Sequence, residues 1–260
     1  VVNWSLTHPA RDVRGYLVTD QFERRYASAV DIENISVVAP RDAVAPAVAA
    51  AVEARRAAPP ARPPGDLSQL LARPCAADRL HEQVAAGLER GYPSRFQAVR
   101  YECLDAAGHY FLRYTVPAAF GDVSDAEVQR YGDVLMSHYA AADQMLGRVM
   151  AALQPGDLLL VVSGFGMEPM SIGKRLLERA FGNPEPSGTH ETAPDGFLLA
   201  YGTDIRPGRL TRGSVVDIVP TILYFYGLPV GRDMDGYART DIFAPAFSAG
   251  RPITYIPSYE

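Results

Sequence analysis

Two patterns of hydrophobic positions follow one another along the second half of the chain. The aliphatic run at residues 158–162 is nearly continuous, and a second apolar run covers residues 196–202. Runs of this kind are typical of strands that are buried on both faces of a parallel sheet. A third, more mixed stretch at residues 97–104 also has strand composition. We therefore predict that these three strands are neighbours in one mostly parallel sheet.

Between the strands, hydrophobic residues recur every three or four positions, which predicts amphipathic helices. The longest pattern runs from Val128 to Leu153 and ends at Pro155 and Gly156. It follows Ser124-x-x-Glu127, a capping box that favours a helix start. We predict one long helix here, packed on the sheet. His138 lies near its apolar stripe, so we interpret it as a core or boundary residue rather than a metal ligand.

Shorter helices are expected elsewhere, and together with the strands they set the predicted fold. They cover residues 67–71, 80–88 with a stop at Gly91, 174–181, and a stretch through 223–226 that Asp217 caps. Strands that alternate with helices predict an α/β fold, with a mostly parallel, doubly wound sheet flanked by helices, as one domain over residues 1–260. Within that domain, we expect an Ala/Pro-rich helix and connector at residues 40–66. Residues 1–6 have a strand pattern, residues 15–20 form a short apolar run that ends in Asp, and residues 35–39 are a weaker strand candidate.

Charge and composition exclude some partners. The net charge of -5 lacks the clustered Lys and Arg that a nucleic-acid duplex requires, so no duplex partner is expected. No apolar run reaches the roughly 18 to 20 residues that span a bilayer, and no leader precedes the first strand pattern, so we expect a soluble chain without a membrane span. Cys75 and Cys103 do not lie in a C-x-x-C pair, and we interpret both as buried small apolar residues.

Candidate metal chemistry centres on Asp105 and His109, which follow the strand predicted at 97–104. With His190 they would give the three ligands and open position that catalytic zinc uses, because carboxylate and imidazole both suit this ion. Another interpretation stays open. An Asp at a strand end often caps a turn, and a His after a Gly is often a solvated loop residue.

Five short motifs occur along the chain in an order that is similar to the order in a known protein family. They are Tyr101 to His109, Ser163 to Gly166, Gly188-Thr189-His190 with Pro194-Asp195-Gly196, Asp217 to Thr221, and Met234-Asp235-Gly236. In this order they resemble the alkaline phosphatase superfamily, and most closely its type I phosphodiesterase/nucleotide pyrophosphatase branch. The resemblance covers about residues 97–236.

This resemblance implies an alkaline phosphatase-like fold and a site with two divalent metal ions, usually zinc, and a Thr or Ser nucleophile. Asp105, His109 and His190 match the ligands of one ion. Gly164 and Phe165 stand where the family has the Asp and His of the second site, so that site is expected to be degenerate. The family's nucleophile and remaining Asp ligand would come from a segment before Val1, and Ser163, Thr189 and Ser187 match no nucleophile position.

Three functions remain in view. The first is a zinc-dependent hydrolase that acts on small phosphoric esters, such as phosphodiesters or nucleotide pyrophosphates. The second is a non-catalytic member that binds a ligand, a partner or a single metal, and the third is a structural α/β domain. For residues 1–260 alone we expect no appreciable phosphodiesterase turnover. Glu168, Glu191 and Arg175 are possible substrate contacts or surface charges.

Overall fold

The computed structural model describes residues 66–91, 95–182, 186–210 and 212–259. The strands and the helix predicted before residue 66 lie outside the described residues. The chain divides into two compact units, one reaching to Ala140 and including Pro169–Gly188, the other made of Ala141–Glu168 and Thr189–Glu260. The single domain predicted over residues 1–260 stays a prediction.

The described part of the first unit is mainly helical. A 3-10 turn, η2 (Leu67–Leu71), begins after Asp66, whose side chain accepts a hydrogen bond from the Ser68 amide. The other elements are α3 (Ala72–Gly91), α4 (Cys103–Thr115), η3 (Pro117–Ala119), α5 (Asp125–Tyr131), the start of α6 (Val134–Ala152) and α7 (Ile172–Ala180). The predicted stop at Gly91 and the predicted helix at 174–181 are confirmed, the latter as α7.

The strand predicted at 97–104 is wrong. Residues 97–102 have no regular secondary structure, and α4 begins at Cys103, so Asp105 lies in the first turn of a helix. The prediction relied on strand-like composition and overlooked that the apolar residues from Cys103 onward recur every three or four positions, as in a helix. Ala107, Phe111 and Tyr114 are buried on one face of α4, where they pack against Leu71, Tyr131 and Leu135 of the same core.

The long helix predicted from Ser124 to Leu153 is interrupted. The capping box is confirmed, because the Glu127 carboxylate accepts from the Ser124 amide at 2.9 Å and the Ser124 hydroxyl accepts from the Glu127 amide at 3.3 Å. However, α5 ends at Tyr131, and α6 begins only at Val134. A Cβ atom at Gly132 would lie 2.6 Å from the Val128 carbonyl oxygen, so this break is a place of close backbone packing.

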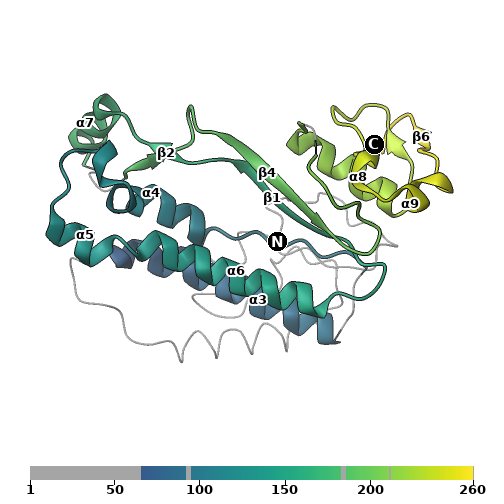
Figure 1. The fold of residues 1–260 in the computed structure, drawn as a ribbon, viewed down its shortest axis with the longest axis horizontal. Helices are drawn as coiled ribbons and strands as arrows, with labels where there is room; N and C mark the ends of the chain where they lie inside the picture. The colour runs from purple at the N-terminus through teal and green to yellow at the C-terminus, as the bar shows by residue number, and fades with distance from the viewer. Residues whose placement is uncertain (1–65, 92–94, 183–185, 211, 260) are drawn as a thin grey trace. The chain divides into compact units, whose positions relative to one another are not determined.

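The second unit contains strand β1 (Leu159–Phe165) and strand β4 (Asp195–Tyr201), which pair antiparallel from Leu159 opposite Tyr201 to Phe165 opposite Asp195 (Figure 1). The other described sheets also have two strands each: β2 (Glu168–Pro169) with β3 (Gly188–Thr189), and β5 (Val230–Gly231) parallel to β6 (Tyr255–Ile256). The predicted doubly wound, mostly parallel sheet is therefore wrong for the described residues.

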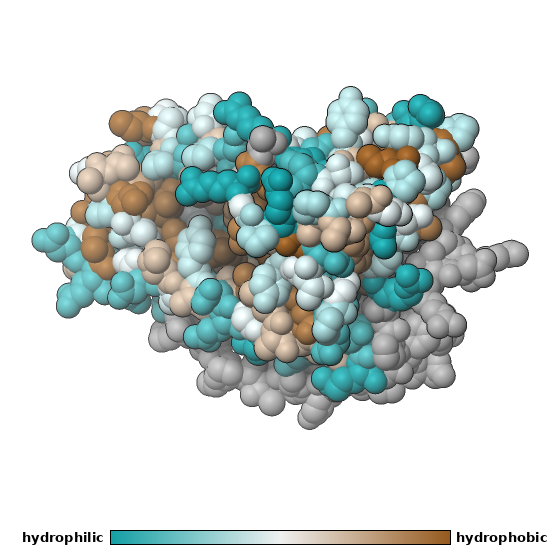
Figure 2. Space-filling view, turned by 45° about the vertical axis from the view of Figure 1, so that its right-hand side comes forward, coloured by the Kyte–Doolittle hydropathy of each residue, from teal (hydrophilic) through white to brown (hydrophobic). Residues whose placement is uncertain are grey.

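The burial of the strands explains why a parallel sheet, with strands buried on both faces, was wrongly predicted. The residues of β4 alternate between exposed and half-buried, and Phe197, Leu199 and Tyr201 are each more than half exposed. This alternation is typical of an antiparallel ribbon with one covered face. Hydrophobic side chains therefore reach the surface among hydrophilic ones (Figure 2).

The core of the second unit is aromatic and lies beside its C-terminal helices. It is built around Tyr224 of α8 (Ile218–Phe225) together with Ile242 and Phe243. The ring of Phe243 stacks on Phe247 of α9 (Pro245–Ala249) with centroids 4.6 Å apart. The remaining turns are η4 (Val215–Asp217) and η5 (Thr240–Ile242). The helix predicted after Asp217 is confirmed as α8.

No helix within the described ranges is both long and apolar enough to cross a lipid bilayer, as the sequence predicts.

One buried histidine in α3 predicts how stability depends on pH. Burial lowers the pKa of His81 below 6.5, although the Arg100 backbone and the Glu102 carboxylate act in the opposite direction. Between the lowered pKa and 6.5 the unfolded chain binds more protons than the folded chain, so stability is lost as pH falls through this window. In wild type the free energy of unfolding should fall by up to about 1.4 kcal/mol per pH unit in this window. We expect His81→Leu to remove this fall, because leucine binds no proton.

The measurement is urea unfolding at a series of pH values below and above 6.5. The control is Gln83→Leu, an apolar replacement at an exposed position of the same helix. It should leave the pH dependence unchanged. Parallel pH profiles for wild type and His81→Leu would show that His81 does not titrate differently in the folded chain.

Candidate metal centre

Asp105 and His109 lie one turn apart on α4, so their side chains share one face of the helix. Asp105 Oδ2 is 3.6 Å from His109 Nε2, and 54% of the Asp105 side chain and 33% of the His109 side chain are exposed. The pair is therefore open to solvent and its donor atoms converge. The four-residue spacing noted in the sequence thus gives proximity through a helix rather than through a strand end.

The orientation of His109 is fixed from the opposite side of its ring. His109 Nδ1 is 2.9 Å from the Gly188 carbonyl oxygen. Because a carbonyl oxygen only accepts, Nδ1 carries the proton of the neutral ring and donates, and Nε2 then has its lone pair on the side of Asp105. Metal-binding histidines use the same arrangement, in which the second ring nitrogen donates to a carbonyl or carboxylate.

The segment that supplies this carbonyl is tied to α4. The Ser187 amide donates to the His109 carbonyl at 2.7 Å, and the Arg113 amide donates to the Ser187 hydroxyl at 3.3 Å. Ser187 is fully buried. The sequence analysis considered Ser187 only as a nucleophile candidate, whereas its hydrogen bonds hold the His109 ring partner in place.

His190 has the same hydrogen-bond arrangement in the second unit. Its Nδ1 is 2.5 Å from the Gly166 carbonyl oxygen, so in the neutral ring Nδ1 is again the donor and Nε2 has the lone pair. The His190 ring also packs against Phe165, with centroids 5.6 Å apart. The Gly166 amide donates to the Pro194 carbonyl at 2.7 Å, which fixes the backbone that holds His190.

Among the described residues, two groups could hold a metal ion. One is Asp105, His109 and His190, and the other is Cys75, Cys103 and His138, whose donor atoms lie within 4.8 Å of one another. Asp105 and His109 belong to the first unit and His190 to the second. The assignment of the first group as the ligands of one ion stays a prediction.

Gly164 and Phe165 end strand β1. Neither has a side chain that could bind a metal, and 68% of Phe165 is exposed. The hydroxyl of Ser163 donates to the Phe165 carbonyl at 2.9 Å, and Thr189 is buried. These positions therefore offer backbone and apolar contacts rather than a second set of metal ligands.

Glu168 and Arg175, named above as possible substrate contacts, have structural partners. Glu168 accepts hydrogen bonds from the amide and the hydroxyl of Thr192, at 2.8 Å and 2.5 Å. Arg175 donates to Asp122 at 3.1 Å. Partial burial raises the pKa of Asp122, but Arg113 and Arg175 lower it more strongly, so the carboxylate stays charged between the two guanidinium groups. Glu191 is exposed.

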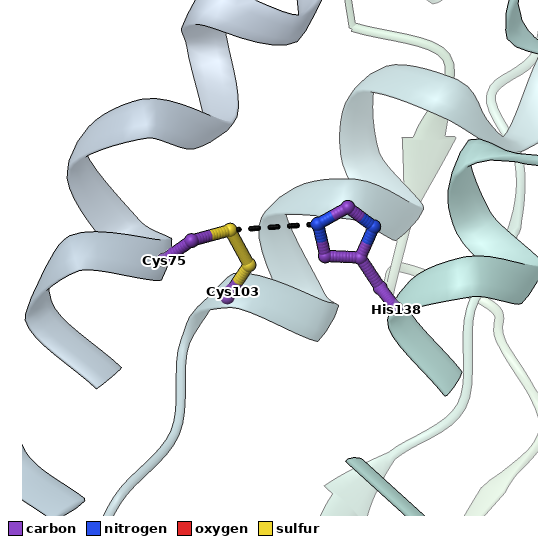
Figure 3. Close-up of side chains that lie close together, drawn as sticks. All are labelled: Cys75, Cys103 and His138. Atoms are coloured by element: carbon purple, nitrogen blue, oxygen red, sulfur yellow. Dashed lines mark hydrogen bonds between the residues drawn. A yellow bond between two sulfur atoms is a disulfide. The ribbon is translucent and has the colours of Figure 1, made fainter. Parts of the chain in front are cut away.

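The interpretation of the cysteines as separate apolar residues is wrong. Cys75 of α3 and Cys103 of α4 form a disulfide, 28 residues apart, with Cα atoms 4.5 Å apart (Figure 3). His138, predicted to be a core or boundary residue of its helix, is half-buried beside it, and its Nε2 is 3.5 Å from Cys75 Sγ. Nothing local in the sequence indicates this pairing, because it depends on how α3 and α4 pack.

No family model, curated protein or solved structure matches this chain.

Proposed function

We propose that this chain binds one divalent metal ion, with zinc preferred, through Asp105 Oδ2, His109 Nε2 and His190 Nε2. The observation that carries the proposal is the common arrangement of the two histidines. Each donates its Nδ1 proton to a backbone carbonyl, which directs Nε2 away from that contact and gives it a lone pair. Asp105 adds an anionic oxygen 3.6 Å from one of these nitrogens. Two imidazoles and a carboxylate suit zinc and leave a coordination position for a further ligand.

We further propose that the chain belongs to the lineage of metal-dependent hydrolases of phosphoric esters. The five motifs from Tyr101 to Gly236 support this, together with the ligand set they contain. A bound zinc ion would polarise a phosphoryl oxygen of a small ester. The chain's own residues would place the ion: Gly188 and Gly166 hold the two rings through their carbonyls, and Asp105 offsets part of the charge.

A non-catalytic, metal-binding member is the second candidate, and a specific observation favours it. The two positions where the resemblance implies ligands for a second ion hold Gly164 and Phe165, which have no donor side chains. Paired ions stabilise both the attacking and the leaving oxygen during phosphoryl transfer. A single ion would provide only part of this stabilisation. If the chain is a non-catalytic member, we therefore expect it to bind metal without turnover.

The test is zinc binding by the oxidised chain, measured by equilibrium dialysis without reductant so that the two cysteines stay paired. We expect one zinc ion per chain, and a loss of affinity of about 100-fold or more in Asp105→Asn and in His190→Ala, because ligand loss costs at least as much as the loss of a supporting contact. Asp143→Asn, an exposed carboxylate on α6, is the matched control and should bind as wild type.

A phosphodiester turnover assay on the same samples separates the two candidates. Zinc-dependent turnover that is lost in Asp105→Asn favours the hydrolase, and binding without turnover favours the non-catalytic protein. If the oxidised wild type binds no zinc, or if the two variants bind as tightly as Asp143→Asn, the proposed site is wrong.

A further inference from the structure

The second ligand group shares no residue with the site proposed above and lies within the first unit. Three helices contribute to it: Cys75 from α3, Cys103 from the first turn of α4, and His138 from α6. The three side chains point toward one another (Figure 3), and their donor atoms lie within 4.8 Å of one another. Two sulfurs and one imidazole nitrogen form a donor set that zinc prefers.

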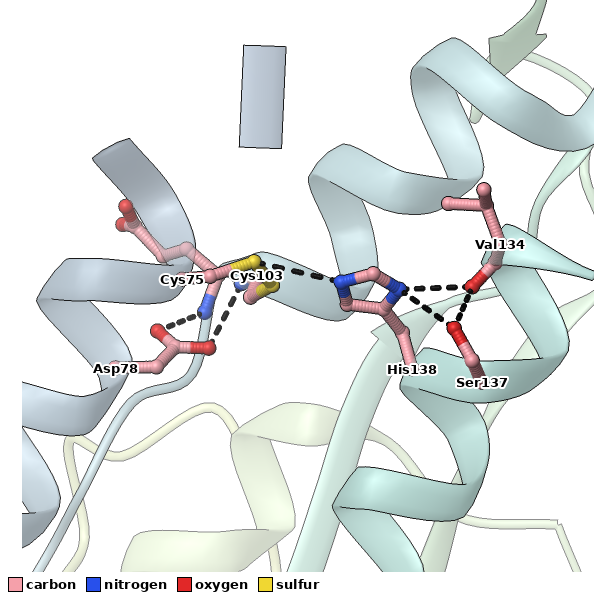
Figure 4. Close-up of a disulfide and its surroundings, with 7 residues drawn as sticks. Cys75, Asp78, Cys103, Val134, Ser137 and His138 are labelled. Carbon is pink, nitrogen blue, oxygen red and sulfur yellow. Dashed lines mark hydrogen bonds between the residues drawn. A yellow bond between two sulfur atoms is a disulfide. The ribbon is translucent and has the colours of Figure 1, made fainter. Parts of the chain in front are cut away.

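His138 is oriented so that its Nε2 faces the sulfur. Its Nδ1 is 2.8 Å from the Val134 carbonyl oxygen, one turn earlier on α6, and 3.5 Å from the Ser137 hydroxyl (Figure 4). The carbonyl accepts, so in the neutral ring Nδ1 carries the proton and Nε2 has the lone pair. A disulfide sulfur has no proton to donate. The oxidised pair therefore cannot satisfy this nitrogen, whereas a thiol proton or a metal ion can.

The cysteine backbones are held independently of the disulfide. Asp78 lies one turn beyond Cys75 on α3, and its carboxylate accepts from the amides of Glu102 and Cys103, at 2.8 Å each (Figure 4). These bonds attach the start of α4 to α3. The core cluster of buried residues around Phe111 also packs against Cys75. When the disulfide opens, the two sulfurs consequently stay close to each other and to His138.

We propose that the reduced chain binds one zinc ion through Cys75 Sγ, Cys103 Sγ and His138 Nε2, and that formation of the disulfide excludes the ion. The pair is thus a redox-controlled metal site. No other His, Cys, Asp or Glu joins this group among the described residues, so water completes the tetrahedral coordination. This site is separate from the one formed by Asp105, His109 and His190, and it does not depend on the function proposed for that site.

The chemistry balances in both directions. A dithiol reductant opens the disulfide by exchange: its own two thiols become a disulfide, and Cys75 and Cys103 gain one proton each. Zinc then displaces both thiol protons and forms two Zn–S bonds and one Zn–N bond. In reverse, hydrogen peroxide takes two electrons from the two thiolates, the S–S bond forms again and Zn²⁺ is released. Two protons and the peroxide yield two water molecules.

The experiment uses the whole chain, reduced with a phosphine that is then removed under anaerobic conditions, and Co²⁺ as the probe. We expect the cobalt–thiolate charge-transfer absorption to appear in the reduced chain and to saturate at one thiolate-bound ion per chain. This absorption should be absent from the oxidised chain, because the site proposed for Asp105, His109 and His190 has no sulfur ligand. His138→Ala should weaken Co²⁺ binding by about 100-fold, since a ligand is lost. Cys75→Ser with Cys103→Ser should abolish the thiolate absorption.

Asp143→Asn, an exposed carboxylate on α6, is the control and should leave the thiolate absorption unchanged. Circular dichroism follows folding in each sample. If the reduced chain unfolds, Co²⁺ must restore its helical signal for the proposal to stand. Thiolate absorption of equal strength and midpoint in wild type and His138→Ala, no absorption after reduction, or cobalt bound by a chain that stays unfolded would each overturn it.

Discussion

Opening the disulfide between Cys75 and Cys103 is expected to lower the free energy of unfolding by about 3.5 kcal/mol in the absence of metal. The bond closes a loop with a sequence separation of 28 residues, and cross-linking restricts the unfolded chain more than the folded one. The loop-closure relation gives about 3.5 kcal/mol for a loop of this length. The folded state loses little in return, because Asp78 still holds the start of α4.

The measurement compares guanidinium unfolding of the oxidised and the phosphine-reduced chain, both with a chelator present. This comparison keeps every side chain the same and changes only the bond. Cys75→Ser with Cys103→Ser serves as a second reduced-like state that cannot reoxidise. It should unfold at a similar denaturant concentration with and without reductant. A difference below about 1 kcal/mol between the free energies of unfolding of oxidised and reduced wild type would contradict the expectation, because a stabilising disulfide typically contributes about 2 to 4 kcal/mol.

The elements of this chain could largely be predicted, but the way in which they pair could not. The aliphatic run at 158–162 does form a strand, and the Ser124 capping box does begin a helix. Their partners are set by contacts distant in the sequence. The antiparallel pairing of Leu160 with Ala200 depends on a connection of about forty residues, and an apolar strand looks alike in parallel and antiparallel sheets.

The stretch at 97–104 shows how two local patterns can compete. Its Val, Tyr and Cys have strand propensity, yet Cys103 already belongs to the helical series that continues through Ala107 and Phe111. Burial of that series against Leu71 and Tyr131 is a tertiary effect, and it overrides the local preference.

The prediction of the candidate ligands does not depend on this error. Asp105 and His109 are four residues apart, a spacing that places them on one face of a helix, and the composition of a metal site does not depend on the element that carries it. The contacts that hold the two histidine rings, and the disulfide, could not be predicted from the sequence. The Gly188 and Gly166 carbonyls have no side-chain signal, and the pairing of Cys75 with Cys103 spans two helices.

The motifs near the C-terminus have a structural role in the second unit. The Asp217 carboxylate accepts from the amides of Ser214 and Tyr237, at 2.9 Å each. Thr221 donates its hydroxyl proton to the Asp217 carbonyl at 2.6 Å, and the same hydroxyl accepts from the Arg239 amide at 2.9 Å. Asp217 and Thr221 are both buried. They attach the segment around residues 236–239 to the start of α8.

Gly236→Ala is expected to lower the free energy of unfolding by about 2 to 3 kcal/mol, the range for overpacked positions. A Cβ atom at Gly236 would lie 2.0 Å from the Val216 carbonyl oxygen and 2.7 Å from the Asp217 amide nitrogen. Both atoms belong to the backbone, so no side-chain rotation relieves the clash. The segment must move instead, which weakens the hydrogen bond from the Tyr237 amide to Asp217.

Gly147→Ala is the matched control, because it adds the same methyl group in the middle of α6, where no atom lies within 4 Å of the added Cβ. Alanine has the higher helix propensity, so this variant should gain about 0.5 to 1 kcal/mol. Guanidinium unfolding of the oxidised proteins gives both values, so the two substitutions should differ in sign as well as in size. If Gly236→Ala unfolds within about 0.5 kcal/mol of wild type, the close approach of residues 216 and 236 does not exist in solution, and the proposed role of Asp217 as an anchor fails with it.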